Sequence, residues 1–202
     1  MAVQRGATDR DGCFWQGEWT TAATHLGESA RLELGSADFG RSHAALLRLD
    51  AYQGGKAAVQ ERWTHFHVAH TPGPWPSAGD RLMAIAGAEA WVAVGEHTKA
   101  AALYPQIAEA SAHGTLIAWD DLRLLATAAA VSAAAGGHWE LAEAHFTEAL
   151  LQADTLPHRL EQADAPPCHA GDGWPRPLQV TWCRWARTWI AATAGSPGYQ
   201  SR

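Results

Sequence analysis

The stretch GHWELAEAHFTEAL, Gly137–Leu150, decides the fold class, because it joins a glycine turn to one apolar face of a helix. Ala142, Phe146 and Ala149 are spaced by four and then three residues, so they lie on the same side of an α-helix. The preceding segment, 120–135, is rich in alanine and leucine and contains no proline. The sequence therefore predicts two helices joined by a turn at Gly137.

The same pattern occurs three more times upstream. Its glycine anchors, at positions 17, 54, 95 and 137, are separated by 37, 41 and 42 residues, a spacing typical of helix-turn-helix repeats. Three later positions of each copy share one helix face, at five, nine and twelve residues after the anchor. They are occupied by Ala22, Val59, Ala100 and Ala142, then by Leu26, Trp63, Tyr104 and Phe146, and then by Ser29, Phe66, Ile107 and Ala149.

Helices are also predicted ahead of the turns, at 42–53, 80–94 and 120–135, and a lone helix is predicted at 18–32. Asp80, and Asp120 or Asp121, are expected to cap two of these helices. Small residues, Ala84 with Ala88 and Ala126 with Ala130, would let the partner helix approach closely. Alternating apolar and polar runs of strand length are almost absent, so we expect no β component.

These elements predict an all-α fold of antiparallel helix pairs, stacked side by side as about three and a half repeats of a short solenoid over residues 15–163. Residues 1–14 are expected to be a poorly ordered remnant and 164–202 an irregular tail. Asp50 departs from the pattern, because it occupies a position where a large buried residue is expected. The chain would begin inside a repeat, either as a fragment or with its first helix covered by a partner.

The segment from Gly137 resembles the second helix of a tetratricopeptide repeat. The turn, small and aromatic positions of that motif are filled by Gly137, Trp139, Ala142, Phe146 and Ala149, with Gly95, Ala100 and Tyr104 in the preceding copy. The longer segment Ala100–Ala163 resembles the C-terminal repeats of large bacterial signalling proteins. Those proteins carry an AAA-type ATPase module together with a class III adenylate or guanylate cyclase domain or a LuxR-type DNA-binding domain.

This resemblance implies a non-catalytic scaffold for protein–protein interaction or regulation in signal transduction, as a fragment or stand-alone relative of such a repeat region. In tetratricopeptide arrays the first helix of each pair lines a groove that holds the partner. The corresponding residues of this chain are Arg41, Arg48, Leu82, Ile85, Glu89 and Thr127. Arg41 and Arg48 are seven residues apart and could accept an acidic segment, although a solvated helix face is the other interpretation of this pair.

Composition limits the partners and the compartment. The 202 residues carry 21 acidic and 15 basic side chains, so a net charge of −6 argues against direct nucleic-acid binding. Three scattered cysteines favour a reducing cytoplasm over a disulfide framework. Met1–Gly12 has no apolar signal segment, and the apolar run 124–135 is shorter than the roughly 20 residues that a membrane-spanning helix needs. We expect a cytoplasmic protein without a membrane partner.

Motifs for catalysis are not found. The sequence has no phosphate-binding GxxxxGK[ST] loop and no GxSxG nucleophile elbow, so neither an enzyme nor a cofactor is predicted. The alternative hypothesis is a small helical metal- or ligand-binding domain that uses His65, His67 and His70. His67 and His70 could share a helix face, but no Cys, Asp or Glu between positions 65 and 77 completes a ligand set.

Four of the 11 tryptophans occur in the proline-rich tail, at positions 174, 182, 185 and 189. Three interpretations remain open. A loose or disordered segment is favoured. A helix over Val180–Ala192 that buries Trp182, Trp185 and Trp189 against the last repeat comes next, because those residues share one helix face. A basic amphipathic helix on an anionic membrane is the least favoured of the three.

Overall fold

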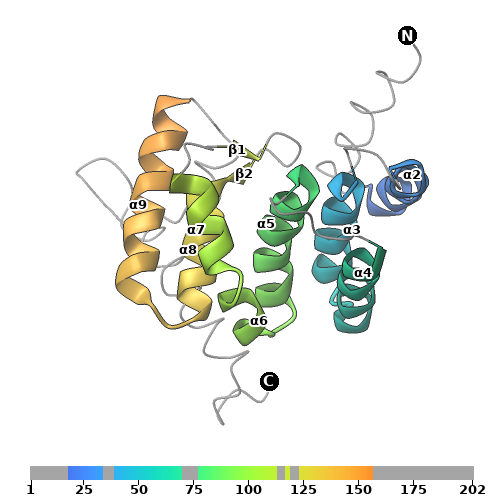
Figure 1. The fold of residues 1–202 in the computed structure, drawn as a ribbon, viewed down its shortest axis with the longest axis horizontal. Coiled ribbons are helices and arrows are strands. Elements are labelled where there is room, and N and C mark those ends of the chain that lie inside the picture. The colour runs from blue at the N-terminus through green and yellow to red at the C-terminus, as the bar shows by residue number, and fades with distance from the viewer. Residues whose placement is uncertain (1–17, 34–38, 70–76, 113–116, 119–122, 157–202) are drawn as a thin grey trace. The chain divides into compact units, whose positions relative to one another are not determined.

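The computed structural model describes residues 18–33, 39–69, 77–112, 117–118 and 123–156, and most of these are helical (Figure 1). In this respect the all-α prediction is confirmed. The chain divides into two compact units, Met1–Ala90 and Trp91–Arg202, with the boundary inside one helix. The elements are α2 Trp19–Leu32, α3 Arg41–Tyr52, α4 Lys56–Ala69, α5 Ala78–Ala93, α6 His97–Ala101, α7 Tyr104–Ala112, β1 Ile117–Ala118, β2 Arg123–Leu124, α8 Leu125–Ala135 and α9 Trp139–Thr155.

Three glycine anchors end their helices in the same way. Gly54, Gly95 and Gly137 have φ of +75°, +80° and +76°, a left-handed conformation that glycine adopts without a steric penalty. Each anchor N–H donates to the carbonyl three residues before it, and the next N–H donates to the carbonyl five residues before it, which is a Schellman motif. The donor and acceptor pairs are Gly54 with Ala51, Gly55 with Asp50, Gly95 with Val92, Glu96 with Trp91, Gly137 with Ala134 and His138 with Ala133, at 2.7–3.0 Å. The fourth anchor, Gly17, lies outside the described residues.

The next helix also begins in the same register in all four copies. Its first residue is the second after the anchor, at Trp19, Lys56, His97 or Trp139. The small residue five after the anchor donates its N–H to the residue just after the anchor, in the pairs Ala22 with Glu18, Val59 with Gly55, Ala100 with Glu96 and Ala142 with His138, at 2.9–3.2 Å. All four small residues are buried, with at most 3% of their surface exposed. The predicted small position is therefore confirmed in every copy.

The two larger positions behave less uniformly. Phe66, Ile107 and Ala149 are buried at the last of the three positions, but Ser29 is half-buried. At the middle position Leu26 is buried, whereas Trp63, Tyr104 and Phe146 are half-buried. The small position is therefore the most uniformly buried of the three.

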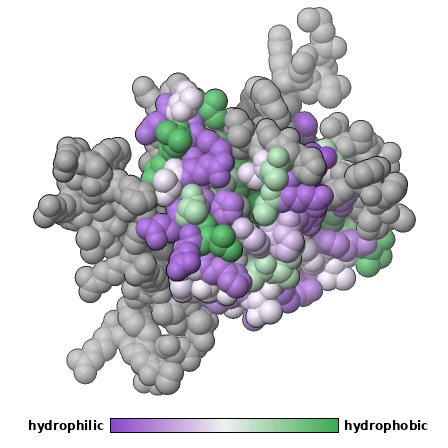
Figure 2. Space-filling view, turned by 60° about the vertical axis from the view of Figure 1, so that its left-hand side comes forward, coloured by the Kyte–Doolittle hydropathy of each residue, from purple (hydrophilic) through white to green (hydrophobic). Residues whose placement is uncertain are grey.

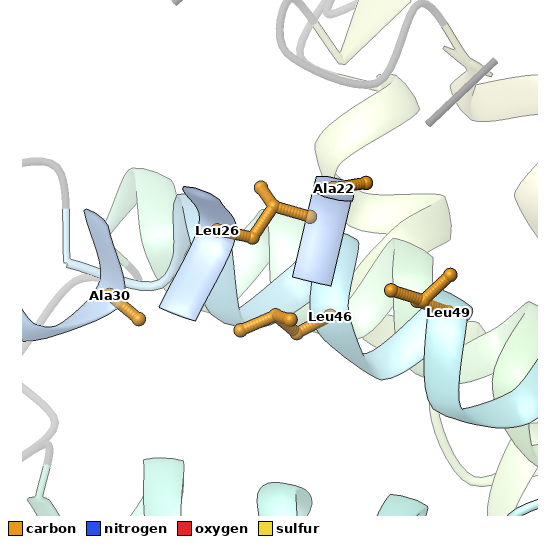
Figure 3. Close-up of a cluster of buried hydrophobic side chains, with 5 residues drawn as sticks. All are labelled: Ala22, Leu26, Ala30, Leu46 and Leu49. Carbon is orange, nitrogen blue, oxygen red and sulfur yellow. The ribbon is translucent and has the colours of Figure 1, made fainter. Parts of the chain in front are cut away.

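In the first unit α2 packs on α3 through a small aliphatic cluster. Ala22, Leu26 and Ala30 of α2 meet Leu46 and Leu49 of α3, and the five side chains point toward one another in Figure 3. Removing large aliphatic side chains from water contributes about 1.5–3 kcal/mol each. This burial fixes the predicted lone helix, which begins at Trp19, one residue later than expected.

At the start of α5 the cap is Ser77, and Asp80, which was predicted to cap the helix, lies in its first turn and bonds back to Ser77. Asp80 accepts a hydrogen bond from the N–H of Ser77 at 2.7 Å, and the hydroxyl of Ser77 accepts one from the N–H of Asp80 at 3.1 Å. This reciprocal capping box satisfies two N–H groups at the helix start. Further along, Ala84 and Ala88 are buried, as are Ala126 and Ala130 of α8, which agrees with the small-residue prediction.

Glycines also bring the starts of α3 and α5 together within the first unit. A Cβ atom added at Gly40, where φ is +110°, would lie 2.7 Å from the Cα of Gly79. One added at Gly79 would collide with the backbone carbonyl of Phe39. Only glycine fits at both positions, and no local sequence pattern predicts this contact.

The helix predicted after Gly95 is interrupted. It forms two shorter helices, α6 and α7, which both contact α8. Pro105, in the first turn of α7, has no N–H to donate to Ala101 four residues earlier. The N–H of Leu103 therefore bonds to Ala100, three residues back, at 3.1 Å, and the helix restarts at Tyr104.

The helix predicted at 120–135 starts five residues later than expected, at Leu125. Leu124 pairs with Ile117 and Arg123 with Ala118 in a two-residue antiparallel ladder, so this part of the chain is extended. The expectation of no β component was wrong at this one place. The N-cap of α8 is Leu124, with extended dihedral angles, so capping of this helix by Asp120 or Asp121 is also wrong. Residues 119–122 themselves lie outside the described part.

The remnant at 1–14 and the tail at 164–202 also lie outside the described residues, so those predictions stay untested.

Within the second unit α8 and α9 pack against each other (Figure 1). Their contact consists mainly of buried alanines, and we call it the alanine seam. Leu124 and Ala126 meet Ala149 and Ala153 in one buried cluster. Ala133 and Ala134 meet Ala142 in another, against which Tyr104 packs.

Candidate functional site

Arg48, one of the predicted groove residues, is buried and forms an ion pair. Its Nε lies 2.8 Å from Oε2 of Glu89, and the two side chains are only 4% and 10% exposed. The structure thus brings together two predicted groove residues from α3 and α5. Because an ion pair with so little solvent is costly to separate, Arg48 cannot reach an external acidic segment while this pair is formed.

Arg41 differs from Arg48, although the two are seven residues apart on α3. Arg41 is exposed at the first position of the helix. Of the other residues predicted for the groove, Leu82 and Ile85 of α5 are buried in the first unit. Thr127 is buried on α8 in the second unit. Arg41 is therefore the predicted groove residue whose surface a partner could contact.

Two further carboxylates organise α3 within the first unit. Glu33 is buried, and its carboxylate accepts hydrogen bonds from the N–H of Ser42 at 3.1 Å and from the Ser42 hydroxyl. A carboxylate at a helix start is favoured by the helix dipole. At the other end of α3, Asp50 accepts a hydrogen bond from Nε of Arg62 on α4, at 2.5 Å. This ion pair explains why Asp50 occupies a position where a large residue was expected.

His43 lies in an aromatic pocket between α3 and α4. Its ring centroid is 5.3 Å from that of Phe39 and 6.1 Å from that of Phe66, and the two phenyl rings stack at 5.1 Å. His65 lies 5.8 Å from His43. Burial lowers the pKa of His43 to about 4, helped by the positive charge of Arg62 and by His65. Its Nδ1 is buried without a hydrogen-bond partner, so the neutral ring fits this pocket better than the charged one.

The structure describes two of the three residues of the alternative metal-site hypothesis. His65 and His67 are both exposed on α4, and His70 lies outside the described residues. Nδ1 of His67 is 2.8 Å from the carbonyl oxygen of Trp63, one helical turn earlier, and the two rings lie 4.5 Å apart. Among the residues that the structure describes, no group of three or more His, Cys, Asp or Glu side chains could hold a metal ion.

In the second unit a tyrosine and a histidine connect α7 to α9. The hydroxyl of Tyr104 is 3.0 Å from Nε2 of His145, and the rings meet edge to face at 5.7 Å. Nδ1 of His145 lies 3.8 Å from Oε2 of Glu148. Because Tyr104 also packs against the alanine seam, this contact fixes α7 against α9.

Near the start of α6, Nζ of Lys99 lies 4.4 Å from the ring centroid of Trp91, where a cation–π contact contributes about 0.5–1 kcal/mol at an exposed site. Burial lowers the pKa of His97 on the same helix, an effect that Glu96 opposes. These contacts lie next to the turn at Gly95.

The described residues therefore form a helical protein made of glycine-turn hairpins, with Arg41 as the exposed member of the predicted groove. No family model matches the sequence, and neither a curated protein nor a solved structure is significantly similar to it. No helix in the described ranges is both long and apolar enough to cross a membrane.

Proposed function

We propose that the chain is a non-catalytic helical-repeat scaffold that binds a protein partner, and that its hairpins belong to a short tetratricopeptide-like right-handed stack. One observation carries this proposal: four helices begin in the same register, each with a buried small residue at the same position, and three of them follow the same glycine turn. Repetition of one supersecondary unit favours extended binding surfaces over a single reactive centre. The partner would be a separate protein or the effector domains of a parent signalling chain.

Arg41 is the residue that we place at the partner surface. It is exposed at the first position of α3. An arginine on a partner surface suits an acidic segment, because a guanidinium binds a carboxylate through two parallel hydrogen bonds.

A quantitative capture experiment tests this function. The immobilised full chain is compared with Arg41→Glu and with Arg31→Glu, a matched charge reversal at an exposed position of α2. We expect at least one protein to bind the wild type and the Arg31→Glu variant in equal amounts and to be lost with Arg41→Glu. Capture that is the same for all three chains, or that does not exceed the blank matrix, would contradict the proposal.

A further inference from the structure

α9 has an exposed apolar strip in addition to its packed face. The packed face is made of Ala142, Ala149 and Ala153, which are all buried. Leu141 and Leu151 are 46% and 69% exposed, and Ala144 is exposed between them. Positions 141, 144 and 151 lie on one side of a helix because they are spaced by three and seven residues. We call these three residues the α9 outer strip.

Carboxylates flank this strip. α9 carries Glu140, Glu143, Glu148 and Asp154 but neither lysine nor arginine. The first three are exposed, and Glu148 lies on the same side as the outer strip. An occupant that combines large apolar side chains with positive charge would thus suit this side of α9. Figure 2 shows the same mixture on the described surface, where hydrophobic residues lie among hydrophilic ones.

The chain itself contains a segment with this chemistry. Val180–Ala192 has three tryptophans at positions 182, 185 and 189, two arginines at 184 and 187, and no acidic residue. It lies outside the described residues. We propose that this segment docks as a helix on the α9 outer strip, with its tryptophans against Leu141, Ala144 and Leu151.

Spacing and reach support this choice of occupant. The tryptophans are spaced by three and four residues, like Leu141, Ala144 and Glu148, so both helices present ridges that can interdigitate. The 23 residues from Pro157 to Gln179 can span at most about 76 Å. The 17 residues of α9 are about 26 Å long, so the segment can reach every turn of the helix.

Disulfide trapping in the full chain tests the docking, with one thiol supplied by Ala186→Cys. Residue 186 comes four residues after Trp182 and three before Trp189, so in a helix it lies on the tryptophan side of the segment. The background is Cys13→Ser, Cys168→Ser and Cys183→Ser, which removes the three native thiols. Ala144→Cys places a second thiol on the outer strip. Glu143→Cys is the matched control, since residue 143 is also exposed but points about 100° away around the helix. Oxidised glutathione serves as the oxidant, and the disulfides are mapped by mass spectrometry.

We expect the intrachain 144–186 disulfide to form several times faster than the 143–186 disulfide. Adding Trp185→Ser and Trp189→Ser should lower the 144–186 rate to that of the control. Equal rates at 144 and 143 would overturn the proposal, because they would mean random collisions of the tail. Disulfides that form mainly between chains would also overturn it, by assigning the outer strip to a second copy.

Discussion

The α3–α4 hairpin and the α8–α9 hairpin share one turn but differ in what fills the seam between their helices. Between α3 and α4 lie the stacked rings of Phe39 and Phe66, the buried His43 and the ion pair of Asp50 with Arg62. Between α8 and α9 lie mainly alanines, in two small clusters. The same turn therefore occurs with two different kinds of interhelical packing. We infer that the turn determines how the two helices are connected, and that the side chains between them determine the packing of each copy.

The largest expected effect concerns α3. Arg48→Ala should lower the free energy of unfolding by about 3–5 kcal/mol, because it leaves the Glu89 carboxylate buried without its partner. Chemical denaturation measures this loss. Replacing both partners, as Arg48→Met with Glu89→Leu, should restore most of the stability, since neither charge then remains buried. If the double variant is as unstable as Arg48→Ala, the ion pair is not the reason for the loss.

The aromatic seam should make the first hairpin sensitive to acid. The pKa of His43 is about 4 in the folded protein and about 6.5 when unfolded, so between these values only the unfolded state holds the proton. The contribution of neutral His43 to the free energy of unfolding is complete above pH 6.5 and is lost as the pH falls toward 4. The loss amounts to about 3 kcal/mol, at about 1.4 kcal/mol per pKa unit.

Denaturation at pH 7 and at pH 4.5 measures this effect. His43→Phe should reduce the difference in stability between the two pH values, because the phenyl ring fits the pocket and does not titrate. His25→Gln, a control at an exposed histidine of α2, should leave it unchanged. If the free energy of unfolding differs between pH 7 and pH 4.5 by the same amount in His43→Phe as in the wild type, groups other than His43 cause the acid sensitivity.

The alanine seam should instead be sensitive to size. Ala126→Leu places a larger side chain against Ala149 and Ala153, so we expect a loss of about 1–3 kcal/mol from overpacking. Ala57→Leu, the same change at an exposed position of α4, should alter stability by no more than about 0.5 kcal/mol. Equal effects of the two substitutions would show that helix approach at this seam does not depend on small residues.

The sequence predicted the features that depend on local backbone geometry. A glycine at each turn and a small residue five positions later are visible without a structure, because the left-handed turn and the close helix approach each admit few residue types. The interruption after Leu103 also had a local signal, the proline at 105. The later start of α8 had no local sequence signal, since pairing of Leu124 with Ile117 overrides the helical preference of the segment.

The burial of Arg48 could not be predicted, because its partner is distant in sequence. Arg48 and Glu89 are 41 residues apart, so the spacing of Arg41 and Arg48 alone made both appear exposed. The burial of His43 carried no sequence signal, since Phe66, which packs against it, comes from α4. Whether a polar residue is buried depends on its tertiary partner. The periodicity of one helix carries no information about that partner.

The central claim is that the same glycine turn builds both hairpins whatever fills their seams, and one set of substitutions tests it. A Cβ atom added at Gly54 or Gly137 would meet no atom within 4 Å, so alanine there is penalised only by the positive φ, by about 1–2 kcal/mol. Gly27 in the middle of α2 is equally open but helical, so alanine there should stabilise the protein by about 0.5–1 kcal/mol. We predict losses of unfolding free energy for Gly54→Ala and Gly137→Ala that agree within error, and a gain for Gly27→Ala. A loss at only one of the two turns, or at neither, would contradict the account.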